Sequence, residues 1–328
     1  MSADLDEYRR LRLQRAEHLV PVREPLVLVS QIQRSGGTLL SQLFDGHPEC
    51  HAHPGELHLG HPHKLIWPRL DLSGSPAQWF DALYEQKVGR YLRKGYSKAS
   101  RRLERGVDYD VLPFLFAPTL QRELFLRCAE GAAGERDVFD AYFTSFFNAW
   151  LDDHNLYTGP KRVVTGFAAG LAGRAEDVDG FFSVYPDGTL VSIVRDPRGW
   201  YESARRYKDS YADPGAALAL WRASTEAAIE AKHRRPDRVA VLSYEQLVRD
   251  PENVMRGLAG QIGIAFRPEL LVPTFKGRPI RADSSEPVAS YGILPARADA
   301  YRESLGPELA ERIEREAGDL HARALELV

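Results

Sequence analysis

The chain has 328 residues, 44% of them hydrophobic, which is enough apolar material for one large domain or two modest ones. Its net charge of −3 argues against general nucleic-acid binding, so any anion site must be local. The only cysteines, Cys50 and Cys128, exclude a disulfide framework and fit a reducing compartment. Because no apolar signal sequence and no run of about 18 apolar residues is present, we expect a cytoplasmic protein without a membrane span.

The first 22 residues are rich in charge and predict a helical arm, and residues 23–328 then form a single domain. Four short apolar runs do not alternate with polar residues, which is typical of parallel strands buried on both faces. These runs are residues 26–30, 162–165, 189–194 and 238–243. Because helical patterns separate them, we expect an α/β fold with an open, mainly parallel sheet flanked by helices.

The stretch of about 60–160 differs, because it is rich in aromatic residues and shows no clear strand pattern. It predicts a helical insertion between the first and second strands. Its aromatic side chains either form a wall of an acceptor pocket or pack as the core of the insertion. Further along, residues 250–263 begin with Asp-Pro and end at Gly263, as a capped helix does. Residues 272–297 predict an ordered loop.

The sequence RSGGT at 34–38 lies where the first strand turns into a helix. A helix N-terminus leaves backbone N–H groups unpaired, and the two glycines let an anion approach them closely. Arg34 adds a guanidinium, and Ser35 and Thr38 add hydroxyl donors. Neither GxxxxGK[ST] nor GxGxxG is present. We therefore expect a site for one phosphate-like or sulfate-like group, with a ligand-free turn as the alternative.

Three segments together resemble the sulfotransferase family. QRSGGTLLSQLFDGHPE is similar to its 5′-phosphosulfate loop, VSIVRDPRGWYESARRY to its 3′-phosphate motif, and LSYEQLVRDPENVMRGLAGQIGI to its third block. They come in the family's order over roughly residues 24–60 and 160–265. The arginine of the first loop is similar to that of tyrosylprotein sulfotransferases and many bacterial members. The resemblance implies a P-loop-like sulfotransferase fold, 3′-phosphoadenosine 5′-phosphosulfate (PAPS) as donor and 3′-phosphoadenosine 5′-phosphate (PAP) as product.

The resemblance also implies which residues bind the donor. The first loop would hold the phosphosulfate, and Arg195 with Ser203 would hold the 3′-phosphate. Alternatively, Arg195 pairs with Asp196 at the strand end, and Arg205 and Arg206 are helix-surface charges only. The implied donor-binding residues are Arg34, Ser35, Gly36, Gly37, Thr38, Leu39, Arg195, Ser203, Tyr244, Ser284 and Ser285.

Sulfuryl transfer needs a cation beside the bridging oxygen and a base for the acceptor's proton. Arg34 is the expected cation, because arginine keeps its proton. The resemblance implies Glu56 as the base, although the corresponding glutamate of the tyrosylprotein branch lies one residue nearer the loop. His58, His53 and His51 are alternatives, from five histidines in HAHPGELHLGHPH. A zinc site lacks HExxH or cysteine support, so we expect no metal, and a solvated loop is the remaining interpretation.

The leading hypothesis is a PAPS-dependent sulfotransferase that acts on a hydroxyl of a small molecule, lipid or glycan. A small-molecule or nucleotide kinase is the runner-up, and the missing P-loop lysine counts against it. A non-catalytic nucleotide-binding module on the same scaffold is a third hypothesis. The sequence does not name the acceptor, and it leaves the oligomeric state open, with a homodimer as one option.

Overall fold

The computed structural model describes residues 2–59, 66–85, 114–280 and 290–328, and this part of the chain forms two compact units. The first, which we call the helical unit, comprises Met1–Glu24 and His58–Lys161. The second, the α/β unit, comprises Pro25–Leu57 and Arg162–Val328. None of the helices in the described ranges combines the length and the apolar character that crossing a bilayer requires.

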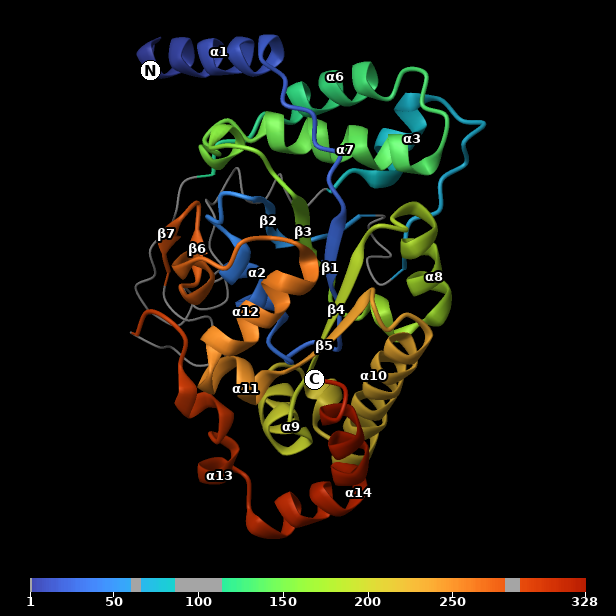
Figure 1. Ribbon diagram of the computed structural model, residues 1–328, viewed down its shortest axis with the longest axis vertical. Coiled ribbons are helices and arrows are strands. Elements are labelled where there is room, and N and C mark those ends of the chain that lie inside the picture. The colour runs from blue at the N-terminus through green and yellow to red at the C-terminus, as the bar shows by residue number, and fades with distance from the viewer. Residues whose placement is uncertain (1, 60–65, 86–113, 281–289) are drawn as a thin grey trace. The chain divides into compact units, whose positions relative to one another are not determined.

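The α/β unit is built on a five-stranded parallel sheet with the strand order β2-β3-β1-β4-β5 (Figure 1). The strands are β1 (Leu26–Val29), β2 (Cys50–Glu56), β3 (Val163–Phe167), β4 (Thr189–Val194) and β5 (Val239–Ser243). All four apolar runs of the sequence are strands, so the prediction of an α/β fold with a parallel sheet is confirmed.

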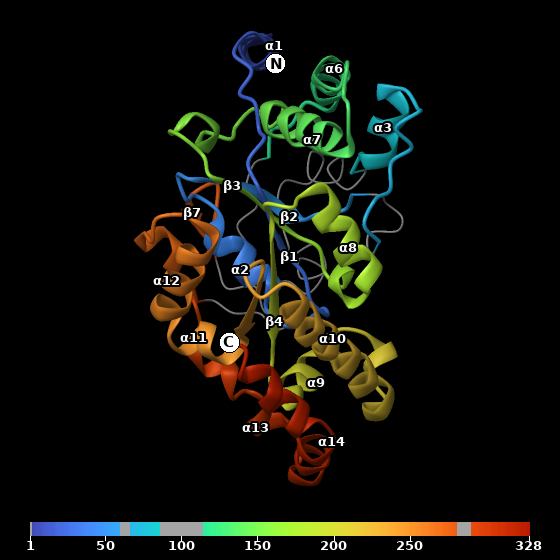
Figure 2. The same ribbon diagram turned by 45° about the vertical axis from the view of Figure 1, so that its right-hand side comes forward.

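Helices cover both faces of this sheet (Figure 2). They are α2 (Gly37–Phe44), α8 (Ala175–Val184), α9 (Pro197–Arg205), α10 (Pro214–Arg234), α11 (Tyr244–Arg249), α12 (Pro251–Ile262), α13 (Tyr301–Ser304) and α14 (Pro307–Leu325). Ala240 and Leu242 of β5 pack in one core with α2, α11 and α12, whereas Val241 packs in the other with α9, α10 and α14. Since both faces are buried, the strands have no polar face, and their apolar runs are continuous.

β2 is an edge strand that the sequence analysis did not predict. It spans part of the histidine-rich segment, and His51 and His53 within it are buried, so the interpretation as a solvated loop is wrong for these two residues. Pro54 is tolerated because an edge strand lacks a partner on one side, and the register with β3 shifts between Ala52 and Glu56. With this additional strand, the segment of about 60–160 follows β2 and still precedes the strand predicted at 162–165.

The predicted caps of α12 are present. The Asp250 side chain accepts a hydrogen bond from the Asn253 backbone N at 3.4 Å, and Gly263 ends the helix with a φ of 77°. Such a positive φ suits glycine, which has no Cβ to clash. Short 3₁₀ turns also occur in this unit, at η2 (Leu171–Gly173), η3 (Asp209–Tyr211), η4 (Pro268–Leu271) and η5 (Pro295–Ala298).

Part of the predicted loop at 272–297 is a hairpin of β6 (Thr274–Phe275) and β7 (Arg278–Pro279). The buried carboxylate of Asp45, directly after α2, anchors this hairpin. It accepts hydrogen bonds from Thr274 Oγ1 at 2.7 Å and from the backbone N of Gly277 at 2.9 Å. The end of the helix that follows the RSGGT turn is thereby tied to a segment more than 200 residues later.

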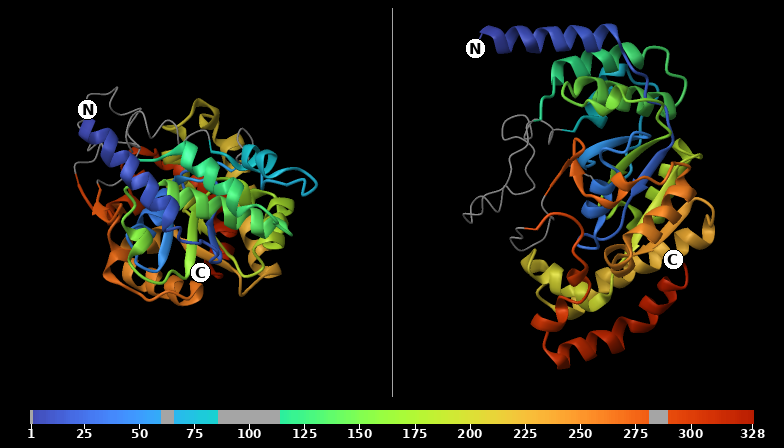
Figure 3. Two further views of the ribbon diagram at one scale, coloured as in Figure 1. Left: turned by 90° about the horizontal axis from the view of Figure 1, so that it is seen from above. Right: turned by 60° about the vertical axis from the view of Figure 1, so that its left-hand side comes forward.

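The helical unit contains α1 (Ser2–Glu17), α3 (Pro76–Leu83), α6 (Pro118–Cys128), α7 (Glu135–Ala149) and the 3₁₀ turn η1 (Asn155–Tyr157). α6 and α7, the green helices of Figure 3, lie side by side. The aromatic rings of α7 are buried among others: the ring centre of Phe146 lies 5.2 Å from that of Phe116 and 5.4 Å from that of Phe147. These aromatic residues therefore form a core, as one of the two interpretations of this segment predicted.

Candidate active site

A cleft of about 250 Å³ opens in the α/β unit where β1 and β4 end. From β1 the sheet continues through β3 to β2 on one side and through β4 to β5 on the other. This reversal of strand order is the place where open α/β sheets bind ligands. The walls come from the turn after β1, from α9, from α11 and from residues 292–304.

The turn after β1 requires glycine at two positions. A Cβ on Gly36, whose φ is 106°, would lie 2.6 Å from Cδ2 of Tyr244. A Cβ on Gly37 would lie only 2.2 Å from Nε2 of Gln31. Arg34 has a φ of 74°, and such left-handed backbone in a non-glycine residue costs on the order of 1 kcal/mol and clusters at ligand sites. This backbone leaves the N-terminus of α2 beside the cleft.

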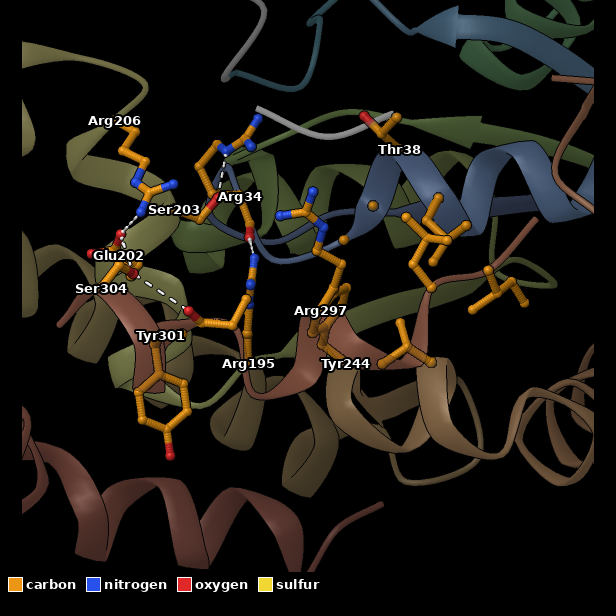
Figure 4. A pocket seen from close by; sticks show the side chains of 18 of the residues that line it. Arg34, Thr38, Arg195, Glu202, Ser203, Arg206, Tyr244, Arg297, Tyr301 and Ser304 are labelled. Carbon is orange, nitrogen blue, oxygen red and sulfur yellow. Dashed lines mark hydrogen bonds and ion pairs between the residues drawn. The ribbon is translucent and has the colours of Figure 1, made fainter. Parts of the chain in front are cut away.

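Arg34 connects this turn to the helix that follows β4. Its Nε donates a hydrogen bond to Ser203 Oγ of α9 at 3.1 Å (Figure 4). Its guanidinium carbon also lies 5.2 Å from the centre of the Tyr207 ring. Thr38 and Leu39, in the first turn of α2, line the same cleft. The structure thus brings residues of both predicted donor motifs together.

Arg195 is 9% exposed and lines the cleft from the end of β4. Its Nη1 donates to the carbonyl oxygen of Arg34 at 2.9 Å, and its guanidinium lies 4.3 Å from the centre of the Tyr244 ring. The alternative pair with Asp196 is wrong, because Asp196 caps α9 and pairs with Arg198 at 2.6 Å. Burial alone would raise the pKa of Asp196, but the hydrogen bonds and charge of Arg198 outweigh it and lower this pKa.

The cleft is far more basic than the whole chain. Four arginines and two glutamates line it, whereas the chain has a net charge of −3. Besides Arg34 and Arg195, these arginines are Arg206 and Arg297. The buried glutamate, Glu202, forms an ion pair with Arg206. Such a concentration of guanidinium groups suits a ligand with more than one phosphate-like group.

Five of the predicted site residues are not among those that line the cleft, namely Ser35, Glu56, His58, Ser284 and Ser285. Ser35 is buried and lines a separate small cavity behind the turn. Ser284 and Ser285 lie outside the described residues. Glu56 is the last residue of β2 and is in register with Phe167, which does line the cleft. The expected base is therefore at the same edge of the sheet as the cleft, next to one of its walls.

His58, the alternative base, is buried and belongs to the helical unit. Its backbone N donates to the Glu85 carboxylate at 2.7 Å. His53 is buried within β2. Among the residues that the structure describes, no group of three or more metal-ligating side chains is arranged to hold a metal ion, and His61 and His63 lie outside this part.

One wall of the cleft has no signal in the local sequence. Arg297, Tyr301 and Ser304 reach it from the C-terminal part of the chain, and no local pattern pointed to them. The interpretation of Arg206 as a helix-surface charge only does not account for its place in the cleft lining. Its spacing of three residues from Ser203 was a usable signal, because residues three apart on a helix lie on one face.

The protein-family model described as "Sulfotransferase family" matches residues 25–268, which is most of the chain. The chain belongs to the sulfotransferase family. The matched region of this sulfotransferase includes the RSGGT turn, α9 and α11, and therefore most of the cleft. A search of curated proteins finds no match.

Solved sulfotransferase structures are similar to the chain over nearly its whole length. The sulfotransferase domain from the curacin biosynthetic pathway has a TM-score of 0.50 and 18% identity, covering 91% of this chain and 99% of that one. The sulfotransferase domain of the Synechococcus PCC 7002 olefin synthase has a TM-score of 0.47 and 22% sequence identity, and the match covers 90% of this chain and 96% of that one. A sulfotransferase from Alicyclobacillus acidocaldarius has a TM-score of 0.44 and 14% sequence identity, and the match covers 93% of this chain and 96% of that one. At 18% identity the first of these supports the fold alone.

Proposed function

We propose that this sulfotransferase moves a sulfonate from PAPS to a hydroxyl group of its acceptor. The observation that carries the proposal is the hydrogen bond from Arg34 Nε to Ser203 Oγ. It joins the turn that resembles a phosphosulfate loop to the helix that resembles a 3′-phosphate motif, within one basic cleft. PAPS carries anionic groups at both its 5′ and 3′ ends and therefore needs two anion sites in one cleft.

At the 5′ end, the N-terminus of α2, Thr38 and Arg34 hold the phosphosulfate. When the bond between sulfur and the bridging oxygen breaks, negative charge moves to the departing 5′-phosphate, which leaves as part of PAP. Arg34 remains protonated at any physiological pH, so it stabilises this charge and does not donate a proton. A preorganised guanidinium in a narrow cleft has little reorganisation to undergo during the reaction.

At the 3′ end, Arg195 and Ser203 hold the phosphate. Tyr244 lies against the Arg195 guanidinium, and the backbone carbonyl of Arg34 accepts one of its N–H groups, so the orientation of Arg195 is restrained from two sides. Ser203 Oγ accepts a hydrogen bond from Arg34, and its own O–H remains able to donate to a phosphate oxygen.

We assign Glu56 as the general base. It takes the proton of the acceptor hydroxyl while the acceptor oxygen forms its new bond to sulfur. Its place at the carboxyl end of β2, in register with Phe167, supports this role. His58 is the alternative base, and a positioned base of either kind contributes on the order of 10²–10⁴ in rate.

The acceptor is a small molecule, and a lipid or glycan hydroxyl falls within the same proposal. Neither cysteine forms a disulfide, which suits a cytoplasmic enzyme. A homodimer stays a prediction that light scattering of the purified protein would test.

The test separates binding from transfer. PAP binding is measured by calorimetry, and transfer is measured from labelled PAPS to a panel of acceptors. We expect Arg34→Ala to lose both, and Glu56→Gln to bind PAP within about twofold of wild type while transferring roughly 100-fold more slowly. Normal turnover of Glu56→Gln would move the base role to His58, which His58→Gln then tests.

The same measurements address the two other hypotheses. A protein that prefers ATP with magnesium over PAP would be a kinase. One that binds PAP but transfers sulfonate to no acceptor, and whose binding is unchanged in Glu56→Gln, would be a nucleotide-binding module. Either result would contradict the proposed transfer reaction.

A further inference from the structure

We infer that Arg206 is a second cation for the 3′-phosphate and that the buried carboxylate of Glu202 positions it. This inference rests on the proposed function, because it names a ligand group of the same cleft. It adds two residues to the Arg195–Ser203 pair on which the resemblance alone would rely.

The first argument is placement on α9. Ser203 and Arg206 are three residues apart at the end of this helix, so they share one face, and both line the cleft. Figure 4 labels both side chains among those that line the cleft and marks the interaction of Arg206 with Glu202. A phosphate bound by the Ser203 hydroxyl would therefore lie within reach of the Arg206 guanidinium.

The second argument is the way in which Arg206 is held. Glu202 is only 5% exposed and forms an ion pair with Arg206. The same carboxylate accepts a hydrogen bond from Ser304 Oγ at 2.7 Å and one from Arg205 Nε at 2.6 Å. A buried carboxylate is stable only with such partners. It restrains an otherwise flexible arginine at the wall of the cleft, and it also connects α9 to α13.

The third argument is charge. A phosphate monoester carries between one and two negative charges near neutral pH, and a single arginine does not neutralise it. With Arg206 in addition to Arg195, the 3′-phosphate has two guanidinium groups of its own, apart from Arg34, which the proposed function assigns to the phosphosulfate. Glu202 does not cancel this excess, because Arg205 and Arg206 both contact it and the three side chains together keep one positive charge.

Arg205 provides a matched comparison within the same helix. It contacts the same carboxylate, but its Nη2 donates to the Ser304 carbonyl oxygen at 3.0 Å and it is not among the residues that line the cleft. The two neighbouring arginines therefore share a structural partner and differ in access to the ligand. If Glu202 and its partners had only a structural role, loss of Arg205 and loss of Arg206 would affect PAP binding equally.

The experiment compares the affinities for PAP and AMP, which differ only by the 3′-phosphate. Calorimetry on the full chain gives the ratio of the two Kd values for wild type, Arg206→Ala, Arg206→Lys, Arg205→Ala and Glu202→Gln. We expect Arg206→Ala to reduce the preference for PAP about tenfold with little change in AMP affinity, as for one lost charge-assisted contact. Arg206→Lys should retain part of the preference, and Arg205→Ala should retain all of it.

Glu202→Gln tests the positioning role. It should reduce the preference for PAP by a smaller factor than Arg206→Ala, and adding it to Arg206→Ala should reduce the preference no further, because both act through one contact. An unchanged ratio in Arg206→Ala, or an equal loss in Arg205→Ala, would overturn the inference. A wild-type protein that binds PAP no better than AMP would overturn the proposed function as well, which distinguishes the two failures.

Discussion

The helical unit and the α/β unit both bury a carboxylate, but they surround it differently. In the helical unit, Glu85 accepts hydrogen bonds from the Tyr142 hydroxyl at 2.8 Å and from the His58 backbone N at 2.7 Å, all within that unit. In the α/β unit, Glu202 is paired with Arg206, which borders the cleft. Hydrogen bonds of this kind connect a buried carboxylate to its own unit, whereas a carboxylate whose partner borders a cleft can orient a ligand group.

The two units also differ in what their aromatic residues do. Those of α7 pack on one another, as the rings of Phe146 and Phe147 do. In the cleft, Tyr244 instead lies against the Arg195 guanidinium and against Gly36. We therefore expect substitutions in the helical core to act on stability, and substitutions around the cleft to act on nucleotide affinity.

The largest effect is expected from Phe146→Ala. This ring is fully buried, so its removal should lower the free energy of unfolding by about 3–5 kcal/mol. The affinity of the folded protein for PAP should stay unchanged. Denaturant unfolding and calorimetry measure the two quantities, with the exposed Leu13→Ala on α1 as the control for a neutral change. A parallel loss of PAP affinity would show that the two units do not act separately.

Arg195→Ala should weaken PAP binding and leave stability nearly unchanged, the opposite of Phe146→Ala. Losing a charge-assisted contact to the 3′-phosphate should weaken PAP binding by about 1.5–3 kcal/mol, or roughly 10- to 150-fold in Kd. Arg249→Ala is the matched control, because Arg249 pairs with Asp299 at the surface and does not line the cleft. Equal PAP affinity in the two variants, measured by calorimetry, would remove Arg195 from the 3′-phosphate site.

Gly37→Ala should lower both the stability of the protein and its affinity for PAP. The added Cβ would meet Gln31 at 2.2 Å and Phe167 at 2.4 Å, and overpacking of this kind costs about 1–3 kcal/mol of stability. Relief of the clash would move the turn, so PAP binding should weaken too. Gly257→Ala in α12 is the control, since nothing lies within 4 Å of its Cβ position. Melting temperatures with and without PAP measure both effects. Equal melting temperatures and equal shifts with PAP in Gly37→Ala and Gly257→Ala would contradict this expectation.

The effect expected at Asp140, in the helical unit, depends on pH. Burial raises its pKa from 3.8 to about 6, although Arg136 lies 2.8 Å away. The folded state therefore holds a proton that the unfolded state has lost, and stability decreases as the pH rises from 3.8 to about 6. Asp140→Asn removes this penalty, so the variant should gain stability relative to wild type as the pH rises through this window. Denaturant unfolding of wild type and Asp140→Asn at pH 3.8 and at about pH 6 measures this gain. A difference in free energy of unfolding that is the same at both pH values would contradict the prediction.

Much of the fold was predictable from local sequence. The four apolar runs became strands and the Asp250 and Gly263 caps bound α12, because burial on both faces and capping are properties of short segments. β2 escaped prediction because its residues, CHAHPGE, contain no β-branched residue and include Pro54 and Gly55, and only pairing with β3 makes the segment a strand. The roles assigned to Glu56 and His58 stay predictions.

The sequence by itself determined the parallel sheet, the glycine turn and the resemblance to a sulfotransferase, since each is written in contiguous residues. Tertiary structure alone decided which side chains contact each other and that Arg297, Tyr301 and Ser304 share the cleft. Arg34 and Ser203 are 169 residues apart and Glu202 and Ser304 are 102 apart, yet both pairs are hydrogen-bonded. Contacts of that kind arise from the strand order and from the packing of α9 against α13, and no local periodicity encodes them.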